Sequence, residues 1–177
     1  MTWARTTTAS GRSLPMFDDF FGLPFHPFIV HATVVVLPAM AGLALAYVVL
    51  PSWRWLLRWP LALAAVGAPV LTWVTVEAGE SLKDRLGIES ALIETHQERA
   101  ELLLYLTLGY GVLALTAAFT LGGPSLLVSG AGSRRGAARP LQMGVGVLLA
   151  VVAVLVVVWV VLTGDAGSRA VWASVPD

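Results

Sequence analysis

The stretch "VGVLLAVVAVLVVVWVVL", residues 145–162, decides the class of fold. It holds 18 consecutive residues without a charged side chain, and its only polar side-chain group is one indole. A helix that spans a bilayer needs roughly 20 mostly apolar residues. Three other runs have the same character, and none of the four contains Asp, Glu, Lys or Arg. The sequence therefore predicts membrane spans at about 28–50, 59–76, 102–121 and 141–162.

Composition supports an integral membrane protein. The chain is 57% hydrophobic and 12% charged, whereas soluble domains have about 25% charged residues. The net charge of zero gives no electrostatic reason to expect a nucleic-acid partner. The absence of cysteine excludes disulfides and thiolate metal sites. We expect an all-α, integral membrane four-helix bundle whose principal partner is the lipid bilayer.

The four spans form one domain, predicted over residues 16–172. Residues 1–15 read as a disordered tail and 173–177 as a short C-terminal tail, and Met16 could be an alternative start. The segment 77–101 has helical periodicity, with a break expected at Gly87 and a new helix starting at Ser90. Small residues at helix-packing spacing predict close contacts between helices: Gly42 and Ala46, Ala64 and Ala68, and Gly111 with Ala114 and Ala118. No repeat of 20–50 residues is found.

Charge predicts the orientation. The two short loops carry Arg54, Arg58, Arg134, Arg135 and Arg139 and no acid, and every Asp and Glu falls on the opposite side. By the positive-inside rule both loops face the cytoplasm. Both termini and segment 77–101 are then extracytoplasmic.

Candidate site residues gather at the predicted outer ends of all four spans. His31 is the principal one, because it lies about one turn inside an apolar run. His26 is expected at the interface, and since five residues turn a helix through about 140°, the two histidines should not share a face. Glu80, His96 and Asp165 are the predicted partners of His31. Imidazole and carboxylate together suit a divalent metal ion.

Simpler interpretations of these residues stay open. Glu80 could pair with Lys83, Arg85 or Arg169, His96 could be solvated, and Asp165 could lie in a helix-end turn made flexible by Gly164 and Gly167. A haem between two histidines is less favoured. His31 and His96 differ in expected depth by about 13 Å, and His26 with His96 matches in depth but should be exposed. A structural subunit with an ion-paired outer cap is the third alternative. No phosphate loop, HExxH or Gly-x-Ser-x-Gly motif indicates an enzyme.

Several short motifs together resemble a known family. They are "GLPFHPFIVHATVVVLP", "EAGESL" followed by "HQERAE", and "TGDAGSRAVW". In order and placement they resemble the bacterial membrane family called domain of unknown function 2231. The matching positions are His26, Pro27, His31, Gly79, Glu80, His96, Gly164, Asp165, Gly167, Ala170, Val171 and Trp172. The resemblance implies four spans in a bacterial cytoplasmic membrane, no established activity, and an indirect link to a membrane redox partner, because some members carry a Rieske domain.

Overall fold

Four long α-helices make up most of the protein. The computed structural model describes residues 19–20, 23–87 and 89–173. An antiparallel pair of two-residue strands, β1 (Asp19–Phe20) and β2 (Leu23–Pro24), precedes the helices. The long helices are α1 (Phe25–Val49), α2 (Arg54–Leu86), α3 (Ala91–Thr120) and α4 (Arg139–Trp172), and the short 3₁₀ helix η2 (Pro51–Trp53) joins α1 to α2. All four are long and apolar enough to cross a membrane.

The predicted all-α four-helix bundle is confirmed, including the helical segment before the third span. α2 ends where Gly87 takes the left-handed conformation (φ 60°), which glycine adopts without strain. The Ser90 side chain then caps α3 by accepting a hydrogen bond from the Ile93 N–H at 3.3 Å. The predicted tail 1–15, the choice of start at Met16 and residues 174–177 lie outside the described residues.

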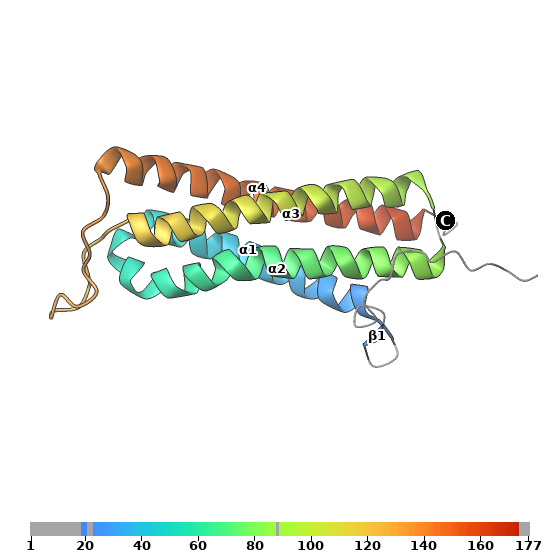
Figure 1. Cartoon of the computed structure of the whole chain (residues 1–177), viewed down its shortest axis with the longest axis horizontal. Helices are drawn as coiled ribbons and strands as arrows, with labels where there is room; N and C mark the ends of the chain where they lie inside the picture. The colour runs from blue at the N-terminus through green and yellow to red at the C-terminus, as the bar shows by residue number, and fades with distance from the viewer. Residues whose placement is uncertain (1–18, 21–22, 88, 174–177) are drawn as a thin grey trace, which may run out of the picture.

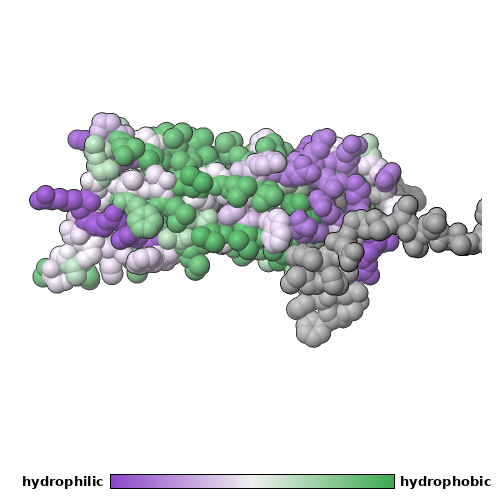
Figure 2. Space-filling model, viewed as in Figure 1, coloured by the Kyte–Doolittle hydropathy of each residue, from purple (hydrophilic) through white to green (hydrophobic). Residues whose placement is uncertain are grey.

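The helices form one elongated bundle in which successive helices run in opposite directions (Figure 1). α1 and α3 each pack on both α2 and α4, so α1 and α3 occupy opposite corners. We call the end with the starts of α1 and α3 the histidine end. The end with η2 and the loop 121–138 is the arginine end. Figure 2 shows hydrophobic side chains over the middle of the bundle and hydrophilic ones gathered at the histidine end.

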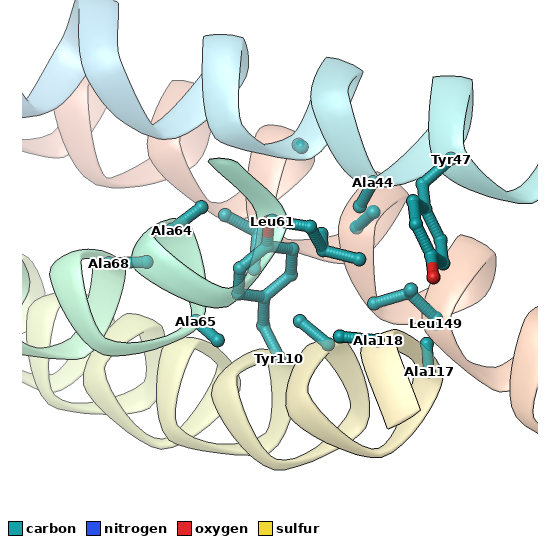
Figure 3. Packing of buried hydrophobic residues seen from close by; sticks show 14 of the residues in the cluster. Ala44, Tyr47, Leu61, Ala64, Ala65, Ala68, Tyr110, Ala117, Ala118 and Leu149 are labelled. Carbon is teal, nitrogen blue, oxygen red and sulfur yellow. The ribbon is translucent and has the colours of Figure 1, made fainter. Parts of the chain in front are cut away.

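Small residues dominate the core between these ends, and tyrosines are its largest buried side chains (Figure 3). The Tyr110 hydroxyl donates a hydrogen bond of 2.8 Å to the Met40 carbonyl, which joins the diagonal helices α3 and α1. Alanines from α2 and α3 lie near the Tyr110 side chain (Figure 3). The predicted small-residue packing is confirmed for Ala64, Ala68, Gly111, Ala114 and Ala118, all of which are buried.

α2 and α3 approach each other closely beside a proline. Pro69 has no N–H, so the carbonyl of Ala65 loses its partner within the helix. Gly111 lies against this carbonyl so closely that a Cβ at position 111 would collide with it. By contrast, the packing role predicted for Gly42 is wrong. That residue is exposed, and a Cβ there would meet nothing.

The hairpins α1–α2 and α3–α4 repeat one pattern of burial. The buried positions of α1 are 33, 37, 41, 44 and 47, and the positions 70 later, 103, 107, 111, 114 and 117, are all buried in α3. α2 and α4 are related in the same way, with a separation of 88 residues. The buried positions of α2 concerned are 61, 65, 68, 72 and 78, and those of α4 are 149, 153, 156, 160 and 166. The bundle is thus built from two equivalent hairpins, α1–α2 and α3–α4, each longer than 50 residues.

Two arginines bind the backbone carbonyls at the ends of α1 and α3, which are equivalent in the two hairpins. The last carbonyls of a helix have no partner within it. Arg54 donates to the carbonyls that end α1, and Arg134 donates to those that end α3. The N···O distances are 2.9 Å from Arg54 to Tyr47 and to Val48, 2.6 Å from Arg54 to Gly122, 3.1 Å from Arg134 to Ala118 and 2.5 Å from Arg134 to Phe119.

Candidate functional site

Two histidines meet between diagonal helices at the histidine end. His26 is the second residue of α1, and His96 lies in the second turn of α3. Their imidazole centroids are 6.4 Å apart, and the ring planes are nearly perpendicular at 80°. Both side chains are half-buried. This histidine pair, His26 with His96, is the one meeting of two predicted site residues in the described part of the chain.

Each ring is held in the same way, through Nδ1. His26 Nδ1 lies 3.2 Å from the Thr75 carbonyl oxygen of α2, and His96 Nδ1 lies 2.9 Å from the Thr163 carbonyl oxygen of α4. A carbonyl oxygen only accepts, so each Nδ1 carries a hydrogen. In the neutral imidazole this leaves Nε2 with a free lone pair. A hydrogen bond of this kind orients most histidines that bind metals.

A glycine makes room for each ring. A Cβ on Gly79 of α2 would lie 3.0 Å from His26 Cε1. A Cβ on Gly167 of α4 would lie 2.9 Å from His96 Cε1 and 3.1 Å from its Nδ1. In both hairpins the glycine lies four residues, or about one helical turn, after the threonine whose carbonyl accepts the hydrogen bond. Ring, carbonyl and glycine thus form one unit that occurs twice.

The sequence carries this unit as a short repeated motif. Residues 75–79 read "TVEAG" and residues 163–167 read "TGDAG", 88 positions apart. The separation equals the register that relates the buried faces of α2 and α4. Aligning the sequence around Glu77 with the sequence around Asp165 reveals the motif. The residues that sequence reasoning undervalued are therefore Thr75 and Thr163, together with the two glycines.

Threonine hydroxyls add polar groups beside the histidine pair. The Oγ1 atoms of Thr33 and Thr75 are 2.7 Å apart, which ties α1 to α2 just inside the pair. The Oγ1 of Thr163 is buried and has no hydrogen-bond partner among the described residues. A buried hydroxyl without a partner is unfavourable. Thr163 thus offers one unused polar atom on the residue that holds His96.

His31, the principal candidate from the sequence, lies outside this site. It is exposed, and its Nδ1 donates to the Pro27 carbonyl of its own helix at 2.5 Å. His26 and His31 face different sides of α1, as predicted, but the one that faces into the bundle is His26. The depth of His31 along α1 suggested burial, whereas its direction around α1 decides its exposure.

The two carboxylates also face outward. Glu80 is exposed on α2, and Lys83, one of its predicted partners, donates to Gln97 Oε1 at 2.8 Å. Asp165 is exposed and forms an ion pair of 2.9 Å with Arg169. The alternative interpretation of Asp165, a helix-end turn, is wrong, because α4 continues to Trp172. Within the described residues, no three His, Asp or Glu side chains are placed to share one metal ion.

Comparison of the chain with family models, with curated proteins and with solved structures gives no match. The resemblance to the domain of unknown function family therefore stays a prediction.

Proposed function

We propose that the chain is an integral membrane protein that binds one transition-metal ion between His26 and His96. The observation that carries the proposal is the matched pair of Nδ1 hydrogen bonds, which leave both Nε2 atoms available. A metal ion bound to two imidazoles at about 2.0–2.1 Å separates their centroids by roughly 5–6.5 Å, depending on the angle at the ion. The centroid separation of 6.4 Å lies at the upper end of this range, which corresponds to a nearly linear N–metal–N angle.

Copper is the metal that we expect. Neutral imidazole suits copper, zinc, iron and nickel, and copper binds such ligands most tightly among the divalent ions. Two protein ligands leave coordination positions for water or for a group on a partner. The half-buried position of both rings leaves the ion accessible to such a partner. This agrees with the membrane redox partner implied by the family resemblance.

The proposed orientation places the histidine pair outside the cytoplasm of a bacterial cell. Five arginines occur in or beside the loops of the arginine end, and the acidic residues of the described chain lie at the histidine end. The positive-inside rule then assigns the arginine end to the cytoplasm and both termini to the other side. The ion would be taken from, and exposed to, the extracytoplasmic space.

Metal analysis of the purified full-length protein tests the proposal. After loading with Cu(II) or Zn(II) and removal of free metal, we expect about one ion per chain, with copper retained in preference to zinc. His26→Gln and His96→Gln should each lose it. His31→Gln is the matched control, because it removes an exposed histidine from the same helix as His26, and it should keep the ion. Metal-free wild-type protein, or equal loss in His31→Gln, would contradict the proposal.

Haem is the second candidate, because haem iron can take two imidazole nitrogens with a similar ring separation. An absorption spectrum after addition of haem distinguishes the two. A Soret band in the wild type that is absent from both His26→Gln and His96→Gln would show that the histidine pair binds haem and not a single metal ion. No Soret band together with bound copper supports the ion.

A further inference from the structure

A pocket of about 200 Å³ lies at the arginine end, far from the histidine pair. It is enclosed by the start of α2, the end of α1 and the loop between α3 and α4. Its walls are basic and aromatic. The lining residues that matter here are Arg54, Arg58 and Arg134 with Trp55 and Trp59.

Arg58 is the arginine in this pocket whose donors are unused. Arg54 and Arg134 direct their N–H groups at the carbonyls that end α1 and α3. The guanidinium carbon of Arg58 lies 5.1 Å from the ring centroid of Trp59 and 5.2 Å from that of Phe119. Within the described part of the chain, Arg58 has neither a hydrogen bond nor an acidic partner. Its aromatic neighbours hold the charge in place but leave its N–H groups free.

The positive charge around this pocket favours an anionic ligand. The arginine end carries Arg54, Arg58, Arg134, Arg135 and Arg139, and no Asp or Glu occurs between residues 50 and 60 or between 121 and 141. Arginine presents a planar fork of donors that matches phosphate oxygens. Three guanidinium groups around one pocket thus form an uncompensated positive centre.

The exposed apolar side chains around this pocket favour a lipid over a free anion as the ligand. The pocket lies beside apolar side chains that stay exposed on the outside of the bundle: Trp59 at 67%, Leu63 at 75% and Phe119 at 55%. An acyl chain can lie along such a surface while its headgroup enters the pocket. Basic pockets between spanning helices on the cytoplasmic side bind anionic headgroups.

We infer that this pocket binds the phosphate of an anionic phospholipid, with the Arg58 guanidinium as its donor. The site is independent of the histidine pair, at the other end of the bundle. The bound lipid would join the start of α2 to the loop before α4.

Native mass spectrometry of the full-length protein, titrated with phosphatidylglycerol or phosphatidylcholine, tests the inference. The wild type should bind one phosphatidylglycerol at least about fivefold more tightly than phosphatidylcholine. Arg58→Gln should lose about fivefold in affinity for phosphatidylglycerol. Arg135→Gln is the matched control, because it removes one charge from the same end outside the pocket, and it should bind as the wild type does.

Equal binding of the two lipids, or wild-type affinity in Arg58→Gln, would overturn the inference. Millimolar inorganic phosphate should not displace the lipid, and displacement would show a site for free phosphate instead. Arg58→Lys keeps the charge but lacks the planar fork of donors, so it decides the matter if Arg58→Gln fails to fold. Weaker phosphatidylglycerol binding in Arg58→Lys supports the inference, and unchanged binding contradicts it.

Discussion

At the scale of single residues, Gly79 and Gly167 are the positions where one methyl group should disable the histidine pair. A Cβ at either position lies about 3 Å from an imidazole carbon, so Gly79→Ala must push His26 aside and Gly167→Ala must push His96 aside. The rings can turn away, so the bundle should remain folded while the Nδ1 hydrogen bonds are lost. We expect copper binding to fall at least tenfold, in line with the loss of groups that orient metal-bound histidines.

Gly164→Ala provides the control for these variants. Gly164 lies on the same helix as Gly167, and a Cβ there would meet nothing within 4 Å. Its replacement should leave copper binding unchanged and stabilise α4 by up to about 1 kcal/mol, because alanine favours helices more than glycine does. Unchanged binding in Gly79→Ala and Gly167→Ala would show that the ring positions do not matter for the ion.

Gly111 is the residue whose replacement should most affect the core. Its neighbour is a backbone carbonyl, that of Ala65, which cannot rotate away as a side chain can. Gly111→Ala should therefore separate α2 from α3 and destabilise the protein by about 1–3 kcal/mol. Thermal unfolding in detergent measures this, with Gly109→Ala on the same helix as the control, since a Cβ at position 109 meets nothing. A melting temperature equal to that of the control would disprove the close contact.

The two histidines of α1 show what single residues reveal before a structure is known. Their spacing predicts that His26 and His31 face apart, and they do. Which of them faces inward depends on the rotation of the whole helix within the bundle. α1 is apolar around its full circumference, so its sequence does not mark a lipid-facing side. Only the contact between His26 and Gly79 of another helix settles the choice.

At the scale of helices, Arg54 joins three of them. Its guanidinium donates to two carbonyls that end α1 and to one just after α3, from the first residue of α2. Arg54→Leu keeps the stem but leaves these carbonyls without donors, and each hydrogen bond to a charged group contributes about 1.5–3 kcal/mol. We expect a loss of stability of about 2–5 kcal/mol, read from unfolding in detergent, and Arg135→Leu should change little. Equal effects of the two variants would refute this role for Arg54.

The ends of helices differ in how well the sequence predicts them. The junction of α2 and α3 is predictable, because Gly87 and Ser90 act through their own backbone and side chain. The end of α4 is not. Gly164 and Gly167 resemble a turn locally, yet α4 continues through them, and Gly167 lies against the His96 ring. A glycine selected for packing and a glycine selected for a turn look alike in a single sequence.

At the scale of the whole molecule, the proposed orientation is open to a direct test. The chain has no cysteine, so single cysteines can be introduced without background. Glu89→Cys lies at the histidine end and Ser129→Cys in the loop of the arginine end, and both positions are exposed. In intact cells a membrane-impermeant maleimide should label the first and not the second. Labelling of Ser129→Cys alone would reverse the orientation.

The membrane class and the number of helices could be predicted from the sequence, because apolar runs act independently of one another. The histidine pair could not, because it depends on contacts between residues 70 positions apart in helices at opposite corners. The equivalence of the hairpins is only partly visible in the sequence. The motif shared by residues 75–79 and 163–167 marks it, but only four of the ten pairs of buried positions keep the same residue, as at Ala44 and Ala114 or Leu61 and Leu149.

The equivalence of the two hairpins bears on the descent of the protein. A unit of two spans returns to the side from which it started, so a tandem duplicate is inserted in the same direction as the original. Its basic loop then lies on the same side as that of the original, and no inversion of topology is required, unlike in the inverted repeats of many transporters. A single ancestral hairpin, associated with a second copy of itself, would already have brought two identical histidines together across a twofold axis. Fusion of two such copies would then have allowed each half to diverge.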